Sequence, residues 1–386
     1  MSAVTDVWMI AAIRTPVSPR GGAFATLEPW QLGAAAISDL VKQAFAAQTT
    51  DAPIDAVIMG AALTAGGNAA RLAALGAGLP EPVAALTIDT QCCSGLDSIG
   101  LAASRITSGQ AHAIIAGGLE SFSRAPLRAV RPLDPDDAPV FYDRPAFSPW
   151  ADRDPVLAEA AAELARHENI SRTQQEAFAM ASHERALNNA VDARAIIPLA
   201  GLTADAFARP LSEALCKRLP VLAGDEAHGV TRATIAVEAD AAAAVLLVSA
   251  DWLREHASTR ADDFKPLRVA GHEACGCMPD MPAHGAALAS RKLLQRLALD
   301  PAHIACAEIM EAYAAQAIST IASLGLKNET VNACGGALSR GHPIGASGAI
   351  LAVQLAWRMQ SLAQGAHGLA AIAAAGGLGS ALALTR

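Results

Sequence analysis

The sequence predicts an α/β protein made of two similar halves around a mostly parallel sheet. Short apolar runs alternate with amphipathic stretches over about the first 121 residues, and the same alternation returns near residue 243. Strands that alternate with helices favour a parallel sheet. The sequence Ala-Gly-Gly-Leu occurs near the end of each part, at residues 116–119 and 375–378. A duplicated α/β unit explains this repeat simply, although a chain rich in Gly and Ala also allows a chance match.

Ten short apolar runs are expected to be strands, because turn-forming or polar residues bound them. They cover residues 7–13, 56–60, 83–88, 111–116, 243–248, 267–270, 304–309, 331–333, 369–374 and 381–384. Apolar residues that recur every three or four positions predict helices over 30–47, 94–107 and 157–190. Within the last of these, Ser171 and Gln174 have the pattern of a capping box. Residues 125–155 are rich in Pro, Asp and Arg and form an irregular stretch long enough to be functional.

Size, charge and cysteine content narrow the class of protein. With 386 residues the chain is too long for one simple core, so two or three domains are expected. The net charge of −8, without a basic block, argues against a nucleic-acid partner. No uninterrupted apolar run has the length of a membrane span, and the N-terminus lacks a secretion signal, so a cytoplasmic protein without membrane contact is expected. Seven irregularly spaced cysteines indicate reduced thiols.

Cys92 is the first candidate for chemistry. It lies between an apolar run and a helix that begins near Ser94. A thiol at that place feels the positive end of the helix dipole, which favours the nucleophilic thiolate. A buried and inert cysteine that fills the core is an equally good interpretation of this position alone.

His342 is the second candidate. Residues 341–348 read Gly-His-Pro-Ile-Gly-Ala-Ser-Gly, which predicts a tight corner at a helix entrance. A structural histidine is the alternative, but the repeat puts His342 and Cys92 at matching strand-to-helix corners, where α/β sheets bind ligands. Ser94 and Ser347 follow in the two corners and are expected to cap helices, because neither lies in a Gly-x-Ser-x-Gly motif.

Other patterns argue against cofactor sites. Cys275 and Cys277 form a Cys-x-Cys pair near His272, but no second pair of ligands has the spacing of a zinc site, so no metal is expected. The glycines at 376–379 lack the acidic residue that accompanies a dinucleotide-binding motif.

Taken together, several motifs resemble the thiolase family along nearly the whole chain. In order, these are residues 14–17, 21–24, 65–71, 91–96, 116–126, 171–179 and 335–348. The sequence Gln-Cys-Cys-Ser-Gly-Leu at 91–96 resembles the family's nucleophile motif, with Cys92 at the acylated position. Residues 335–348 resemble its histidine motif. Several motifs in the right order are far more specific than any one of them.

The resemblance implies a thiolase fold, in which two similar α/β halves form a five-layered αβαβα arrangement with an inserted loop domain. The expected domains are an N-terminal half at 1–121 completed by about 229–255, a loop domain at 122–228, and a C-terminal half at 256–386. It also implies acyl-CoA or CoA as substrate, a homodimer or homotetramer, and no metal or organic prosthetic group. Cys92 takes the acyl group in this interpretation, His342 activates it, and the N–H groups of Cys92 and Ala375 face the oxyanion.

Three positions depart from the family pattern. Ala373 stands where a second cysteine normally moves the proton of carbon–carbon bond formation. Met310 replaces an asparagine that holds a water at the thioester carbonyl, and Ala236 replaces a serine that contacts pantetheine. Cys277 is the preferred substitute for the missing thiol, because it aligns near a loop that lines the acyl pocket.

The acylation half of the site therefore looks complete, whereas the half that forms an acetyl-CoA carbanion looks damaged. We expect an acyl-CoA acyltransferase that makes or cleaves a 3-ketoacyl thioester through an S-acyl intermediate on Cys92. One alternative is acyl transfer to another acceptor, or a condensing subunit that depends on a partner protein. Another is a non-catalytic acyl-CoA-binding subunit, although a scaffold has no need of both Cys92 and His342.

Overall fold

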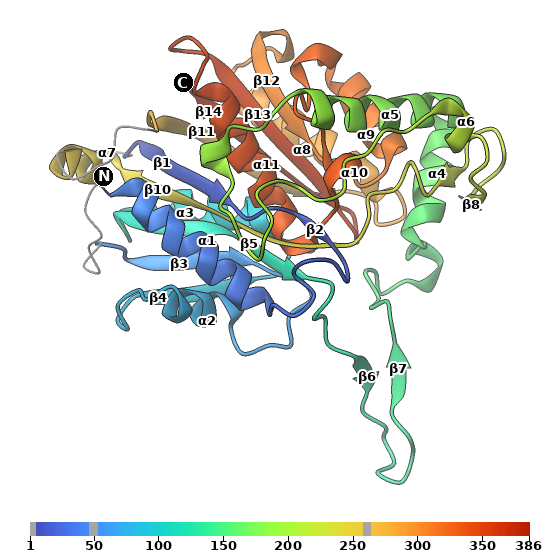
Figure 1. Cartoon of the computed structure of the whole chain (residues 1–386), viewed down its shortest axis with the longest axis horizontal. Coiled ribbons are helices and arrows are strands. Elements are labelled where there is room, and N and C mark those ends of the chain that lie inside the picture. Colours follow the sequence, from blue (N-terminus) through green and yellow to red (C-terminus); the bar gives the residue numbers. More distant parts are fainter. Residues whose placement is uncertain (1–4, 46–52, 258–263) are drawn as a thin grey trace.

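The computed structural model describes residues 5–45, 53–257 and 264–386, and in this part of the chain ten strands form one sheet (Figure 1). The strands are β1 (Val7–Arg14), β2 (Ser18–Pro19), β3 (Ala56–Gly60), β4 (Ala84–Ile88), β5 (Ala113–Ser121), β10 (Ala239–Ser249), β11 (Leu267–Gly276), β12 (Ile304–Ile309), β13 (His367–Ala374) and β14 (Leu378–Thr385). Their order across the sheet is β12-β13-β14-β11-β1-β10-β5-β3-β4, with β2 paired to β10.

The strand order has the same pattern on both sides of its centre, which confirms the duplicated halves. In the first half β3 runs parallel to β4 and β5, and β5, β10 and β1 pair antiparallel in that order. In the second half β12 runs parallel to β13, and β13, β14 and β11 pair antiparallel. The strand expected at 331–333 is reduced to a parallel bridge between Ala307 and Val331, in the place that β4 takes in the first half.

The prediction of a mostly parallel sheet is wrong. Within the described sheet, only β3–β4, β3–β5 and β12–β13 are parallel pairs, and the other pairings are antiparallel. The reason is visible between β13 and β14, which are joined by a tight turn rather than by a helix. Gly376 and Gly377 make this turn with φ of +79° and +76°, and so short a connection forces its strands to be antiparallel.

Helices form three layers with the two half-sheets between them, which confirms the αβαβα arrangement. Helices α1 (Pro29–Ala44) and α2 (Ala69–Gly76) cover the first half on its outer face, and α8 (Gly285–Arg296) and α9 (Ala314–Leu324) cover the second. Helices α3 (Ser94–Thr107) and α11 (Ile344–Met359) pack together between the halves.

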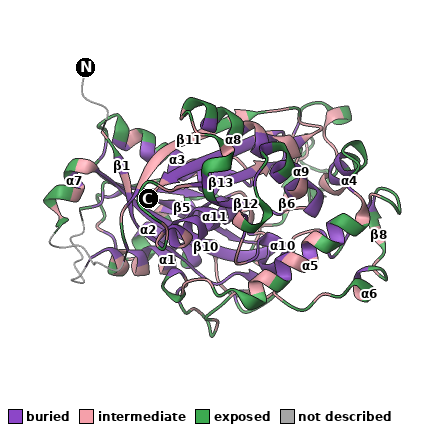
Figure 2. Cartoon of the chain, turned by 90° about the horizontal axis from the view of Figure 1, so that it is seen from above, coloured by how far each residue is buried: buried purple, intermediate pink, exposed green. Residues whose placement is uncertain are grey.

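Strand β10 shows how the layers follow from the sequence. Ala243 and Val245 face the middle layer, whereas Ala244 and Leu246 face the outer layer that contains α1. A strand that is covered on both faces reads as a continuous apolar run instead of an alternating one. Figure 2 shows the same arrangement, with buried strands and α11 at the centre and exposed surfaces on the outer helices.

The two Ala-Gly-Gly-Leu sequences do not occupy equivalent positions. Residues 116–119 lie inside β5, where a Cβ on Gly118 would come within 2.1 Å of the Gly345 carbonyl oxygen at the start of α11. Residues 375–378 instead form the turn from β13 into β14. The duplication therefore rests on the strand order, and the repeated letters are not evidence for it.

The chain between β5 and β10 leaves the layered body. Its elements are β6 (Arg128–Val130), β7 (Val140–Tyr142), α4 (Leu157–His167), α5 (Arg172–Asn188), α6 (Glu213–Cys216), β8 (Val221–Ala223) and β9 (Val230–Thr231). The β6–β7 hairpin extends away from the rest of the molecule (Figure 1). The single helix expected at 157–190 is two helices, because the chain turns at Asn169 with φ of +55°. Ser171 forms the predicted capping box with Gln174 at the start of α5.

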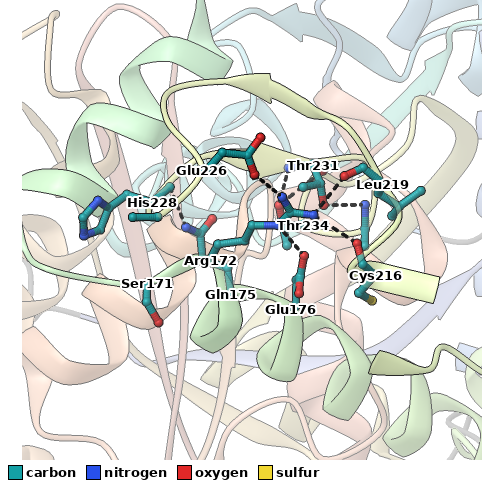
Figure 3. A network of polar contacts seen from close by, with 12 residues as sticks. Ser171, Arg172, Gln175, Glu176, Cys216, Leu219, Glu226, His228, Thr231 and Thr234 are labelled. Atoms are coloured by element: carbon teal, nitrogen blue, oxygen red, sulfur yellow. Dashed lines mark hydrogen bonds and ion pairs between the residues drawn. The ribbon is translucent and has the colours of Figure 1, made fainter. Parts of the chain in front are cut away.

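Arg172 ties the end of this excursion to α5 (Figure 3). Its guanidinium forms ion pairs with Glu176 and Glu226 and donates hydrogen bonds to the carbonyls of Cys216 and Leu219. These contacts fix the chain around residues 216–226, which continues through β9 into β10.

Short elements complete the described chain. They are α7 (Ala250–Glu255), α10 (Ala337–Arg340) and the 3₁₀ turns Ala151–Arg153, Ala193–Ala195, Pro282–His284, Pro301–His303 and Asn328–Thr330. None of the helices in the described ranges has the length and apolar character needed to cross a membrane.

Candidate active site

Cys92 lies in a tight turn between β4 and α3. Gln91 precedes it with φ of +54°, a left-handed conformation that is uncommon for a residue with a side chain. Ser94 ties the turn together, because its Oγ accepts a hydrogen bond from the Thr90 N–H at 2.9 Å and donates one to the Gln91 carbonyl at 2.6 Å. The expectation that Ser94 caps the helix is therefore wrong: Cys93 is at the N-cap position, and Ser94 shapes the turn that presents Cys92.

Helices α3 and α11 cross closely enough to bring the two predicted corners together. A Cβ on Gly95 would lie 2.7 Å from the Ala349 nitrogen, and one on Gly348 would lie 2.5 Å from the Leu96 nitrogen, so only glycine fits at these positions. At the helix entrances, Cys92 Sγ lies 3.2 Å from His342 Nε2. The structure thus joins the two residues that the sequence singled out, although they are 250 positions apart.

Ser347 decides which nitrogen of His342 carries the proton. The Ser347 hydroxyl donates its one hydrogen to the Pro343 carbonyl at 2.9 Å. In that arrangement its oxygen, 2.7 Å from His342 Nδ1, accepts a hydrogen bond from that nitrogen. Nε2 is left with a free lone pair directed at Cys92, which is the tautomer that a base needs. The prediction that Ser347 caps a helix is wrong, because Pro343 holds that position.

Burial determines the charge state of the Cys92–His342 pair. It raises the pKa of Cys92 to about 12, and the nearby Glu120 and Asp89 carboxylates act in the same direction. It also lowers the pKa of His342 to about 4. The sequence predicted that the helix dipole would favour a resting thiolate on Cys92. Burial has the larger effect, because loss of solvent disfavours both the thiolate and the imidazolium. The resting pair is a neutral thiol beside a neutral imidazole.

Two backbone N–H groups oppose this effect of burial at the sulfur. Hydrogen bonds from the N–H groups of Cys92 and Ala375 both act to lower the pKa of Cys92. Donors directed at the nucleophile can also stabilise negative charge that develops beside it. These are the two groups that the sequence assigned to the oxyanion, and the structure brings both to the sulfur.

Glu120 is a buried carboxylate that sequence reasoning did not single out. It accepts hydrogen bonds from the N–H groups of Ala62, Leu63 and Gly345 at 2.8 to 3.1 Å. Burial raises its pKa to about 7. It links the loop after β3 to the corner that carries His342, so it positions this corner. The signal in the sequence was a lone acidic residue in an otherwise apolar strand.

A small and mainly apolar cavity opens beside Cys92 and His342. It has a volume of about 140 Å³. Its apolar lining residues include Leu157, Ala161, Ile235 and Ile344. Besides Cys92 and His342, the polar side chains in the lining are those of Tyr313 and Gln316. Two neighbouring segments close one wall, because the Ala236 N–H donates to the Ala312 carbonyl at 3.0 Å. Such a chamber suits the apolar part of an acyl chain and keeps water away from a thioester.

The three positions that depart from the family pattern lie in two different places. Ala236 and Ala373 line the cavity, each with a side chain that cannot exchange a proton. Met310 is buried in the central core, in the same cluster as Cys92, and is not among the residues that line the cavity.

Cys277 is not among the described residues that line the cavity with Cys92. It lines a different hollow with Glu168 and His284, and its sulfur faces the carbonyls of Met281 and Pro282 at 3.8 and 3.9 Å. The described part of the cavity wall contains no cysteine other than Cys92. The interpretation of Cys277 as a substitute acid or base therefore stays a prediction, which its place in a separate hollow does not support.

Family models match almost the whole chain. The model for the thiolase N-terminal domain matches residues 7–251, and the model for the thiolase C-terminal domain matches residues 265–386.

Individual proteins agree with these matches. The Bacillus subtilis protein YhfS, provisionally named an acetyl-CoA C-acetyltransferase, is 37% identical over 85% of this chain and 86% of its own length. The β-ketoadipyl-CoA thiolase of Pseudomonas knackmussii is 34% identical over 99% of both chains. The crystal structure of human mitochondrial 3-ketoacyl-CoA thiolase in complex with CoA superposes with a TM-score of 0.88, at 26% identity, covering 99% of this chain and 98% of that one.

Proposed function

Because this chain belongs to the thiolase family of acyl-CoA acyltransferases, we propose that it carries an acyl group as a thioester on Cys92. The observation that carries this proposal is the contact of 3.2 Å between Cys92 Sγ and an unprotonated His342 Nε2. The contact lies at the wall of an apolar cavity, where an acyl group displaces water at little cost.

Acylation uses groups that are already in position. His342 Nε2 takes the proton of the Cys92 thiol while the sulfur attacks the carbonyl carbon of an acyl-CoA. The carbonyl oxygen gains negative charge, which the N–H groups of Cys92 and Ala375 stabilise. The bond between the carbonyl carbon and the CoA sulfur then breaks, and the CoA thiolate takes the proton back from His342. The products are S-acyl-Cys92 and CoA, and the resting imidazole is restored.

Carbon–carbon bond formation requires an additional acid or base, and the cavity is poorly equipped with such groups. A group must remove a proton from the α-carbon of a second acyl-CoA, or return it during cleavage. Among the described residues that line the cavity, only Cys92, His342 and Tyr313 can exchange a proton, and in the acyl-enzyme Cys92 is occupied. Burial raises the pKa of Tyr313 to about 12, which makes its phenolate form scarce. We therefore propose that acyl transfer is the efficient reaction and that thiolysis or condensation is slow.

Ala373 favours a second candidate within the same chemistry. Its methyl group lies at the wall of the cavity that contains Cys92 and supplies no acid or base. An acceptor that brings its own nucleophile, such as an alcohol, an amine or a partner-bound thiol, needs no such group. Transfer from S-acyl-Cys92 to an acceptor of this kind is the alternative to a 3-ketoacyl thioester reaction.

Mass spectrometry of the intact protein tests the acyl-enzyme. The purified protein is mixed with acyl-CoAs of two, four and eight carbons, quenched in acid and weighed. We expect one added acyl group per chain, lost again on addition of free CoA. No adduct with any acyl-CoA, in protein whose Cys92 is free to be alkylated after unfolding, contradicts the proposal.

A further inference from the structure

Two polar side chains in the cavity have no part in acylation. Tyr313 stands at the N-cap of α9 and Gln316 lies three residues further on, so both are on one side of the first helical turn. Both line the cavity that contains Cys92. Gln316 is only 4% exposed, yet its Oε1 has no hydrogen-bond partner. An unpaired acceptor at such a depth is costly unless something that enters the cavity pairs with it.

The amide orientation of Gln316 follows from its neighbour. The Thr320 hydroxyl donates its one hydrogen to the Gln316 main-chain carbonyl at 2.9 Å. It can therefore only accept from the Gln316 side chain, which makes the atom at 3.3 Å the Nε2 donor. The free Gln316 atom is thus an oxygen, and the cavity presents an acceptor that requires a donor.

Tyr313 supplies the complementary group. Its hydroxyl forms no hydrogen bond with any residue in the described ranges, and as a phenol it can donate one. Tyr313 and Cys92 line the same cavity of about 140 Å³. A group that binds Tyr313 in this cavity therefore shares it with the acyl group on Cys92.

The character of the cavity restricts what can pair with both side chains. Its described lining contains no Lys, Arg, Asp or Glu. A carboxylate on the acyl chain would be buried without a cation, and an ammonium group would be buried without an anion, so both are disfavoured. A neutral hydroxyl can donate to Gln316 Oε1 and accept from Tyr313 at the same time, which satisfies both side chains with one group.

We infer that Tyr313 and Gln316 form a hydroxyl-binding subsite, and that the acyl group transferred through Cys92 carries a neutral hydroxyl. This inference rests on the proposed acyl-enzyme and adds the chemical class of its substrate. A plain acyl chain of the same length leaves two buried polar groups unpaired, and sites of this kind discriminate strongly against the analogue without the hydroxyl.

Matched acyl-CoAs test the subsite. The rate of Cys92 acylation is measured with butanoyl-CoA, 3-hydroxybutanoyl-CoA, 4-hydroxybutanoyl-CoA and succinyl-CoA. We expect one of the two hydroxyacyl-CoAs to react at least about tenfold faster than butanoyl-CoA, the effect of roughly one buried hydrogen bond or more. Succinyl-CoA is expected to be the slowest. Equal rates for butanoyl-CoA and both hydroxyacyl-CoAs, or a preference for succinyl-CoA, overturn the inference.

Paired variants assign the preference to the two side chains. Tyr313→Phe and Gln316→Met should each lower the ratio of hydroxyacyl to butanoyl rates by about fivefold or more. Two controls make the same chemical changes elsewhere. Tyr142→Phe alters the chain's other tyrosine, in β7, and Gln354→Met alters another buried glutamine with an unpaired Oε1, in a different pocket. A ratio that falls equally in a control, or in none of the variants, removes the subsite.

A binding measurement separates failure of the subsite from failure of the proposed function. Calorimetry on Cys92→Ala compares the same CoA thioesters without any covalent step. Tighter binding of a hydroxyacyl-CoA by about tenfold supports the subsite even if no acyl-enzyme forms. Equal binding of all four thioesters rejects it, even if wild-type Cys92 is acylated.

Discussion

The two sides of the cavity differ sharply in their chemistry. On one side, Cys92, His342 and Ser347 form a continuous chain of hydrogen bonds with a defined proton position. On the other, Ala373 presents a methyl group, and Met310 lies in the central core and does not line the cavity. We propose that the first side opens a thioester, whereas the described residues of the second side give poor support to a carbanion. In this proposal the thiolase fold keeps the groups for one half-reaction and lacks those for the other.

The largest expected effect is at the nucleophile. Cys92→Ala should abolish covalent acylation, because a methyl group cannot attack a carbonyl. Cys93→Ala is the matched control, since Cys93 is the adjacent thiol and its sulfur faces the Ile372 carbonyl in the core. Intact mass after incubation with acyl-CoA measures both. An adduct that persists on Cys92→Ala and vanishes on Cys93→Ala shows that the wrong thiol was chosen.

The next effect concerns the base. His342→Ala should slow alkylation of Cys92 near neutral pH by about 10²-fold or more, because a buried thiol without an acceptor rarely ionises. The rate is followed with iodoacetamide by peptide mass spectrometry. His284→Ala, which alters a histidine in the hollow beside Cys277, should leave the rate unchanged. Equal rates for His342→Ala and wild type reject the pairing.

The pH dependence separates a neutral pair from an ion pair. Burial lowers the pKa of His342 to about 4, so the imidazole stays unprotonated, and able to act as a base, well below the pH at which a free histidine is charged. Glu120, whose pKa burial raises to about 7, also titrates in this range, so the profile is measured in Glu120→Gln, where acylation should be level from about pH 5 to about pH 8 and fall about tenfold per pH unit below about pH 4. A fall with its midpoint near the ordinary histidine pKa contradicts the neutral pair.

Ser347→Ala should have the smallest effect. It removes the acceptor that fixes the Nδ1–H tautomer but leaves the imidazole in place, so we expect a loss of about three- to tenfold in acylation rate. Ser347→Thr keeps a hydroxyl and should recover most of the rate. A loss as large as that of His342→Ala would indicate that the corner has collapsed, which a lowered Tm would reveal.

Local patterns in the sequence predicted much of the fold. The strands Ala56–Gly60 and Ile304–Ile309 and the helix Ser94–Thr107 have the bounds expected from periodicity and turn residues. The direction of strand pairing was wrong, because an apolar run indicates a buried strand without indicating its neighbours. A connection as short as the turn at Gly376 and Gly377 decides that direction.

The site shows a similar limit. Residue type and corner position pointed to Cys92 and His342, and the structure places them in contact. Their charge state depends on burial by distant elements, which no local pattern contains. Cys277 illustrates the same point: its N–H donates to the Gly377 carbonyl at 2.7 Å, while its side chain lies in another hollow. A position inferred from alignment does not determine which way a side chain turns.

Variants that restore the residues typical of the family at Ala373 and Met310 test whether these two positions limit thiolysis. Ala373→Cys places a thiol at the cavity wall, and Met310→Asn places an amide in the central core. The single change Ala373→Cys should raise thiolysis less than the two changes together. Because Met310 is only 1% exposed in the core, Met310→Asn should also lower the Tm, as expected for a buried polar group without a partner.

The most direct test compares the two half-reactions in one unmodified protein. Rapid mixing with acetyl-CoA measures the rate at which Cys92 is acetylated, and mixing with acetoacetyl-CoA and CoA measures thiolysis. Losing a positioned base commonly costs about 10² to 10⁴ in rate. Acetylation should therefore exceed thiolysis by at least about 10²-fold, and Ala373→Cys with Met310→Asn should narrow the gap. Thiolysis as fast as acetylation in the wild-type protein would contradict the account, because the apolar side of the cavity would then contain an acid or base.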